Sequence, residues 1–160
     1  MKRLNCYSHL DFDNLCRTNG WDDNNIPEDS AFISIIGTKE CREEYEVHWF
    51  KEDHDNVLNL EFDDISIEEL TWNECKFTGI TKEQAVRCVN FIDNNIGRNF
   101  YIHCKAGKSR SQGVVRFILD MYKEDYETRK NNPCVFPNIY VLSELKRAYY
   151  KKYNYYETIN

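Results

Sequence analysis

Nine consecutive residues, His103-Cys104-Lys105-Ala106-Gly107-Lys108-Ser109-Arg110-Ser111, bring together a thiol, three basic side chains and a glycine. The apolar run Phe100-Tyr101-Ile102 stands before them and suits a buried strand. Apolar residues then recur at helical spacing: Val114, Ile118, Met121 and Tyr122. The segment is therefore predicted to form a strand, a tight loop and a helix that begins within residues 109–111.

This arrangement suits the chemistry of phosphate. A loop that wraps a helix N-terminus points several backbone N–H groups at one spot, where the helix dipole is positive. Such a spot favours the thiolate form of Cys104. Arg110, six residues later, can return to the same cavity and hold two phosphate oxygens with its planar fork. A thiolate beneath a cradle for a dianion can attack phosphorus.

The pattern Cys-x5-Arg-Ser preceded by His resembles the active-site signature of the cysteine-dependent protein tyrosine phosphatase superfamily. The match covers the defining positions, which are His103, Cys104, Gly107, Arg110 and Ser111. The chain length suggests the compact dual-specificity branch. The resemblance implies hydrolysis of phosphotyrosine, with phosphoserine and phosphothreonine as further substrates, through a phosphocysteine intermediate. It also implies that residues 105–110 bind the phosphate and that no metal or organic cofactor is needed.

This reaction requires a general acid near the end of a neighbouring strand. Asp63 and Asp64 follow the predicted strand Val57–Phe62 and meet that requirement. In relatives the acid is an aspartate on an earlier loop, and Asp64 lies 40 positions before Cys104. Aligning the strand end favours Asp64, with Asp63 as the alternative. The competing interpretation is that one aspartate caps the next turn and the other is solvated.

The resemblance also gives expectations for the other loop residues. Ser111 is expected to hydrogen-bond the sulfur of Cys104 and help it to leave in the second step, although a helix N-cap is the simpler alternative. His103 is expected to point away from the substrate and to orient the loop. Ser109 is expected to be structural, and Gly107 to adopt a backbone geometry that a side chain would block.

Lys105 and Lys108 bear on the substrate. Basic residues at these two positions resemble phosphatases that act on phosphoinositides or inositol phosphates, while the simpler interpretation is two exposed charges. A phosphorylated protein is the preferred substrate, and an inositol phosphate, a phosphoinositide or an RNA 5′-phosphate remains an alternative. A non-catalytic module that binds phosphate is the alternative from another functional class.

Three other sites fit the sequence less well. Gly107-Lys108-Ser109 matches the end of a nucleotide-binding P-loop, but that motif needs a glycine where Ile102 stands. A rhodanese-type sulfur transferase usually has a shorter cysteine loop. The Cys and His residues lack the spacing of zinc ligands.

Composition limits the partners and the compartment. The net charge of −6 disfavours broad binding to nucleic acid or to an anionic membrane. No apolar run approaches the roughly 18 residues of a membrane-spanning helix, and residues 1–5 lack the apolar segment of a secretion signal. There are seven cysteines and no Cys-x-x-Cys pair, so a reduced, cytoplasmic protein is expected. The oligomeric state is left open.

The whole chain, residues 1–160, is expected to form one phosphatase-like domain, with a frayed tail over residues 153–160. Strands are expected at 3–7, 31–36, 57–62 and 100–102, with a further one at 46–50. Helices are expected at 9–18, 81–95, 109–123 and 138–152, with one turn at 67–70 and a polar connector at 124–137. Alternating strands and helices predict an α/β fold with a mostly parallel central sheet flanked by helices.

Overall fold

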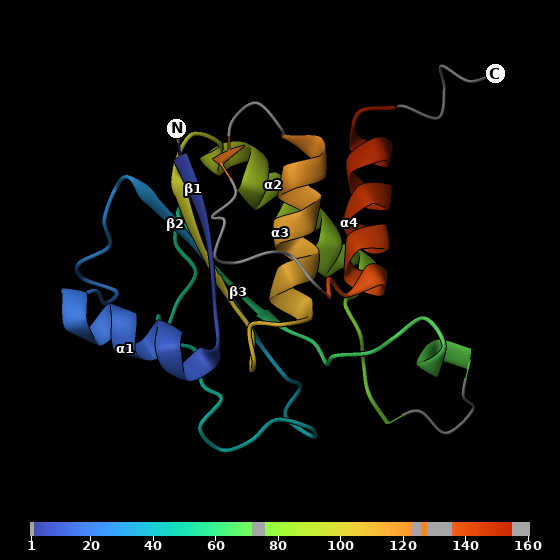
Figure 1. The fold of residues 1–160 in the computed structure, drawn as a ribbon, viewed down its shortest axis with the longest axis horizontal. Helices are drawn as coiled ribbons and strands as arrows, with labels where there is room; N and C mark the ends of the chain where they lie inside the picture. The colour runs from blue at the N-terminus through green and yellow to red at the C-terminus, as the bar shows by residue number, and fades with distance from the viewer. Residues whose placement is uncertain (1, 72–75, 123–125, 128–135, 155–160) are drawn as a thin grey trace.

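The computed structural model describes residues 2–71, 76–122, 126–127 and 136–154 (Figure 1). Its strands form one sheet in the order β3-β2-β4-β1-β5, and every pair of neighbours is parallel. The strands are β1 (Lys2–Tyr7), β2 (Ser30–Ile36), β3 (Val57–Glu61), β4 (Asn99–His103) and β5 (Tyr126–Glu127). The predicted α/β fold with a parallel sheet flanked by helices is therefore confirmed.

The helices cover both faces of the sheet. They are α1 (His9–Asn19), α2 (Lys82–Asn95), α3 (Arg110–Met121) and α4 (Ile139–Lys152), with the short 3-10 helix η1 (Glu69–Thr71). Figure 1 shows α1 on one face and α2, α3 and α4 on the other. Two clusters of buried apolar side chains match these layers, a large one that includes residues of α2, α3 and α4, and a smaller one that includes Phe12 of α1.

The central position of β4 follows from its side chains. Phe100 and Ile102 are fully buried in the large cluster, and burial of such side chains contributes about 1.5–3 kcal/mol each. In register, Ile102 lies between Ile33 of β2 and Cys6 of β1. The carboxyl end of β4 is thus flanked by two strands, and the loop that follows it starts from a fixed position.

The ends of the helices lie at the predicted positions where the sequence carries residues that cap a helix. Thr81 and Gln84 form a capping box at the start of α2, where the sequence predicts a helix from residue 81. Gly20 ends α1 with a φ of 67°, in the left-handed region. Asn138 caps α4 by accepting a hydrogen bond from the backbone N–H of Val141.

Three expectations differ from the structure. Residues 46–50 form no strand, because backbone N–H groups there make local turn bonds: Glu46 N donates to the Glu43 oxygen at 3.0 Å and Val47 N to the Tyr45 oxygen at 2.9 Å. The connector at 124–137 contains β5, and the turn expected at 67–70 is the 3-10 helix η1, shifted toward Thr71. Of the tail at 153–160, Tyr153 and Asn154 form a turn, and residues 155–160 lie outside the described part.

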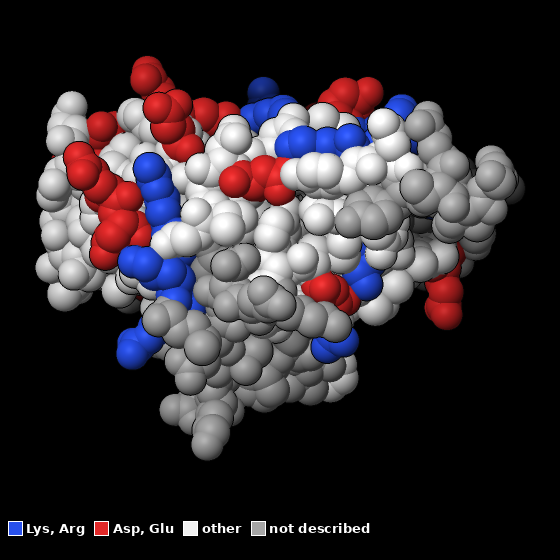
Figure 2. Space-filling model, turned by 90° about the horizontal axis from the view of Figure 1, so that it is seen from above, with Lys and Arg blue, Asp and Glu red and all other residues white. Residues whose placement is uncertain are grey.

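The surface at which the strands begin carries both signs of charge. Figure 2 shows Lys and Arg side chains lying among Asp and Glu side chains on this end of the molecule. Within the described residues, no helix is both long enough and apolar enough to cross a bilayer.

Candidate active site

The predicted strand, loop and helix are present at the carboxyl end of β4. β4 ends at His103, residues 104–109 form the loop, and α3 begins at Arg110. Cys104 is only 2% exposed. Within the part of the chain that the structure describes, the backbone N–H groups of residues 105–108 donate to no acceptor. The loop thus holds unused donors beside the N-terminus of a helix, where an anion is stabilised.

Gly107 gives the loop its shape. Its φ is 69°, and a Cβ atom built there would lie 2.6 Å from the backbone carbon of Tyr7. Two further bonds tie the loop to its neighbours: His9 N donates to the Lys105 oxygen at 3.1 Å, and Gln112 Nε2 donates to the Gly107 oxygen at 3.1 Å. The expected requirement for glycine is confirmed, and its cause is the close approach of the end of β1.

Ser111 lies against the sulfur of Cys104. Its Oγ is 3.0 Å from Cys104 Sγ, and it accepts a hydrogen bond from Cys6 Sγ at 3.1 Å. Ser111 is the second residue of α3, and Ser109 is the N-cap, so the alternative of Ser111 as a helix N-cap is wrong. No local pattern in the sequence connects Cys6 with Ser111, so this contact could not be predicted from the sequence.

Arg110 is a buried cation with unused donors. Its side chain is 6% exposed, and its Nη1 donates to the Phe62 carbonyl oxygen at 2.9 Å. Its Nε is buried and has no acceptor among the described residues. Arg110 lines a cavity of about 140 Å³ together with Lys105 and Asp64. A buried guanidinium with an unused donor can bind an anion that enters the cavity.

The other loop side chains point outward. Lys105, Ala106 and Lys108 are exposed. Lys105 Nζ lies 3.6 Å from Glu43 Oε1, so a carboxylate offsets part of its charge.

The two candidate acids have opposite surroundings. Asp63 is 4% exposed, and its carboxylate accepts hydrogen bonds from Thr38 N and Thr78 N, both at 2.8 Å, and from Thr38 Oγ1. Burial alone would raise the pKa of Asp63, but these hydrogen bonds outweigh it and lower the pKa below its ordinary value. Asp63 therefore joins two loops as a buried carboxylate.

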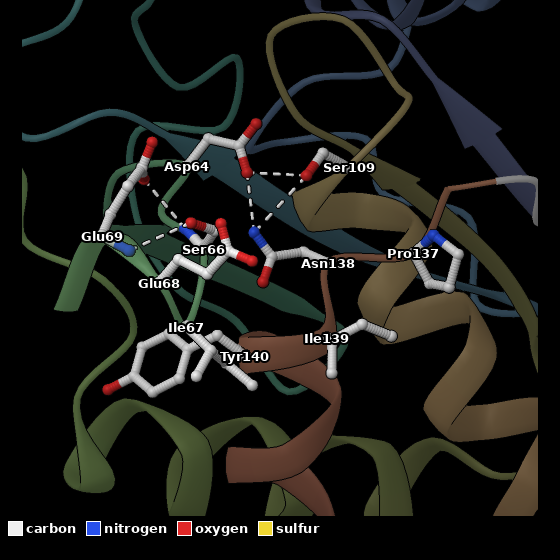
Figure 3. A pocket seen from close by; sticks show the side chains of 10 residues that line it. All are labelled: Asp64, Ser66, Ile67, Glu68, Glu69, Ser109, Pro137, Asn138, Ile139 and Tyr140. Atoms are coloured by element: carbon white, nitrogen blue, oxygen red, sulfur yellow. Dashed lines mark hydrogen bonds between the residues drawn. The ribbon is translucent and has the colours of Figure 1, made fainter. Parts of the chain in front are cut away.

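Asp64 is exposed and faces the loop. Its Oδ1 accepts hydrogen bonds from Ser109 Oγ at 2.6 Å and from Asn138 Nδ2 at 2.7 Å (Figure 3). The expected structural role of Ser109 is thus a contact with the candidate acid. Asn138 was missed, because its sequence signal marks only a helix start.

His103 points away from the loop, toward β2. Its Nε2 lies 2.7 Å from Ser34 Oγ, which lies 2.7 Å from His48 Nδ1. His9 also packs on His103, with ring centroids 5.0 Å apart. Burial, with His9 nearby, lowers the pKa of His103 well below its ordinary value, and burial lowers that of His48 to about 4. These histidines are scattered in sequence, yet they form one buried cluster behind the loop.

Glu46 is a further buried carboxylate that the sequence did not indicate. It is 2% exposed and lines the same cavity as Arg110. Its Oε2 accepts from Glu43 N at 2.7 Å, while its Oε1 has no partner among the described residues. No group of three or more potential metal ligands gathers within the described residues.

Comparison with family models, with curated proteins and with solved structures found no match to this chain.

Proposed function

We propose that the protein is a cysteine-dependent phosphatase that hydrolyses phosphate monoesters of proteins through a phosphocysteine intermediate. The observation that carries the proposal is the buried Arg110, whose Nε has no acceptor among the described residues and whose cavity adjoins the loop that starts at Cys104. A phosphate dianion would accept from this guanidinium and from the backbone N–H groups of residues 105–108. The resemblance of the nine-residue motif to phosphatases agrees with this assignment.

The reaction has two balanced steps. The Cys104 thiolate forms an S–P bond while the bond from phosphorus to the leaving oxygen breaks, and Asp64 gives that oxygen a proton. Water then attacks phosphorus, Asp64 takes a proton from the water, and Cys104 leaves as a thiolate. The hydroxyl of Ser111, 3.0 Å from Cys104 Sγ, donates a hydrogen bond to the departing sulfur.

Asp64 is the better acid on geometric grounds. The hydrogen bonds from Ser109 Oγ and Asn138 Nδ2 both go to Oδ1, which leaves Oδ2 as the atom that carries the proton. Asp63 accepts hydrogen bonds at both oxygens and is turned into the protein.

Turnover of p-nitrophenyl phosphate tests the proposal. Cys104→Ser should bind phosphate and show no turnover, and Cys16→Ser, a matched change on the far face of the sheet, should retain turnover. Wild-type protein quenched during turnover should carry a phosphoryl group on Cys104 by mass spectrometry. Equal hydrolysis by wild type and Cys104→Ser would refute the enzyme, and phosphate binding without turnover would make the protein a phosphate-binding module.

The preference for phosphoproteins over inositol phosphates rests on Lys105. Its contact with Glu43 offsets part of the positive charge that would attract the additional phosphate groups of an inositol phosphate. Phosphotyrosine, phosphoserine and phosphothreonine peptides should be compared with inositol phosphates at equal concentration. A higher kcat/KM for the inositol phosphates would reverse the assignment of substrate.

A further inference from the structure

A second, larger cavity adjoins the loop on the other side of Asp64. Its volume is about 590 Å³, within the roughly 300–1,000 Å³ of small-ligand sites. Figure 3 shows its lining: Asp64, Ser66, Ile67, Glu68, Glu69, Ser109, Pro137, Asn138, Ile139 and Tyr140. We call it the side cavity.

The side cavity adjoins the proposed phosphate site. Asp64 lines both the side cavity and the smaller cavity that contains Arg110. Ser109, a residue of the loop itself, also lines the side cavity and holds Asp64 by the 2.6 Å hydrogen bond. A group covalently attached to the phosphorylated residue can therefore reach the side cavity while the phosphate lies against Arg110.

The lining combines apolar surface with carboxylates. Ile67 and Ile139 are large apolar side chains that are 50% and 53% exposed, and Phe136, next to the lining residue Pro137, is 75% exposed. Exposed apolar side chains gathered at one place mark a binding surface. In Figure 3, Ile67, Ile139 and Tyr140 lie on one side, opposite the contact of Asp64, Ser109 and Asn138.

The charged residues in the described part of the lining are all acidic. Glu68 and Glu69 lie there together with the carboxyl group of Asp64, and among the described lining residues there is no lysine or arginine. This differs from the end of the molecule in Figure 2, where both signs are interspersed. One Glu69 oxygen accepts from Ser66 N at 2.9 Å, which fixes this carboxylate at the rim.

A lysine or arginine side chain is complementary to both features. Its aliphatic stem can cover apolar surface while its charged head contacts carboxylates. A second phosphate group would instead be repelled by Glu68 and Glu69. On the basis of the proposed function, we infer that the side cavity binds a lysine or arginine of the substrate close in sequence to its phosphorylated residue, and that the enzyme prefers basic phosphopeptides.

The test uses phosphotyrosine peptides in which one position at a time, on either side of the phosphotyrosine, is arginine or its uncharged counterpart norleucine. At one position or two neighbouring ones, kcat/KM should be about fivefold higher for arginine, as exposed ion pairs give about 0.2–1 kcal/mol. The ratio between the two peptides is read within each variant, so that it does not depend on the basal rate. It should shrink as the ionic strength rises.

Reversing the charge of one lining residue tests whether the preference for arginine depends on the side cavity. Glu68→Lys should bring the arginine-to-norleucine ratio to one or below. Glu28→Lys, the same charge change on an exposed residue just before β2, should leave the ratio unchanged. Equal rates for the two peptides at every position, or a preference for a second phosphate, would overturn the inference.

The same peptides separate this inference from the proposed function. If wild type does not hydrolyse p-nitrophenyl phosphate, the proposed function fails, and fluorescence anisotropy then decides whether arginine peptides bind more tightly than norleucine peptides. Tighter binding that Glu68→Lys abolishes would support the cavity as a cation site, and equal binding would refute it.

Discussion

At the carboxyl ends of β3 and β4, two neighbouring residues have the same arrangement but different functional groups. After β3, Asp63 is buried and tied to Thr38 and Thr78, while its neighbour Asp64 faces the loop. At the end of β4, His103 is buried and tied to Ser34, while its neighbour Cys104 begins the loop. Successive side chains of an extended chain point in opposite directions. Each strand end therefore supplies one anchoring residue and one residue for the site.

Residue type alone does not show which of two neighbouring residues lies in the site. Two adjacent aspartates have the same functional group, and only the partners of each carboxylate distinguish them. If the comparison holds, changes to the anchoring residues should lower stability, and changes to the presented residues should lower activity.

Arg110→Lys should have the largest effect on activity. We expect kcat/KM for p-nitrophenyl phosphate to fall about 1000-fold, because an ammonium group cannot both contact the Phe62 oxygen and hold two phosphate oxygens. Arg116→Lys is the control, since Arg116 is on the same helix, half exposed and paired with Asp120. A loss of less than tenfold for Arg110→Lys would argue against a bidentate contact with phosphate.

The aspartate pair tests the comparison directly. Asp64→Asn should lower kcat about 100-fold for an ester with a poor leaving group and flatten the limb of the pH–rate profile that reports the general acid. Its free energy of unfolding should change little, since the amide keeps an oxygen for Ser109 and Asn138.

Asp63→Asn should do the reverse, lowering the free energy of unfolding by about 2 kcal/mol because an amide N–H₂ would face backbone donors. Urea titration and steady-state kinetics on both variants supply the measurements. If Asp63→Asn loses turnover at full stability, the assignment of the acid is wrong.

The histidine cluster predicts a loss of stability in acid. Burial lowers the pKa of His48 to about 4, against an ordinary value of 6.5. Between these values the unfolded chain takes up a proton that the folded protein excludes, so stability falls as the pH drops from 6.5 toward 4 and is unaffected above 6.5.

Urea unfolding at pH 7.5 and pH 5 should therefore show that wild type loses about 2 kcal/mol more than His48→Gln. The variant keeps a polar group for Ser34 but cannot titrate. Equal losses in the two proteins would show that His48 does not contribute to the acid sensitivity.

The smallest effect concerns Cys6. Its S–H donates to Ser111 Oγ and so leaves the single hydroxyl proton of Ser111 to Cys104. Because a thiol is a weak donor, Cys6→Ala should lower kcat only about threefold. The double variant Cys6→Ala/Ser111→Ala should be no slower than Ser111→Ala alone, since both act through one hydrogen bond. Additive losses would mean that Cys6 acts independently of Ser111.

The sequence by itself determined the elements that depend on neighbouring residues. The run Phe100-Tyr101-Ile102 predicts β4, the helical spacing after it predicts α3, and the residues of the capping box predict the start of α2. The need for glycine at position 107 could also be predicted. These features follow from local backbone preferences and from the period of apolar residues, which a short window of sequence contains.

Only the tertiary structure decided which distant residues meet these elements. Cys6 contacts Ser111 across 105 positions, and Asn138 contacts Asp64 across 74. The first contact arises because β1 and β4 are parallel neighbours, so that their carboxyl ends lie side by side. The second arises because α4 packs beside α3, where Asn138 N donates to the Ser109 oxygen at 3.0 Å and the side chain of Asn138 reaches Asp64. The side cavity has the same origin, since residues 64–69 and 137–140 form it together. Local patterns fix the elements, and only packing between them fixes which side chains share a site.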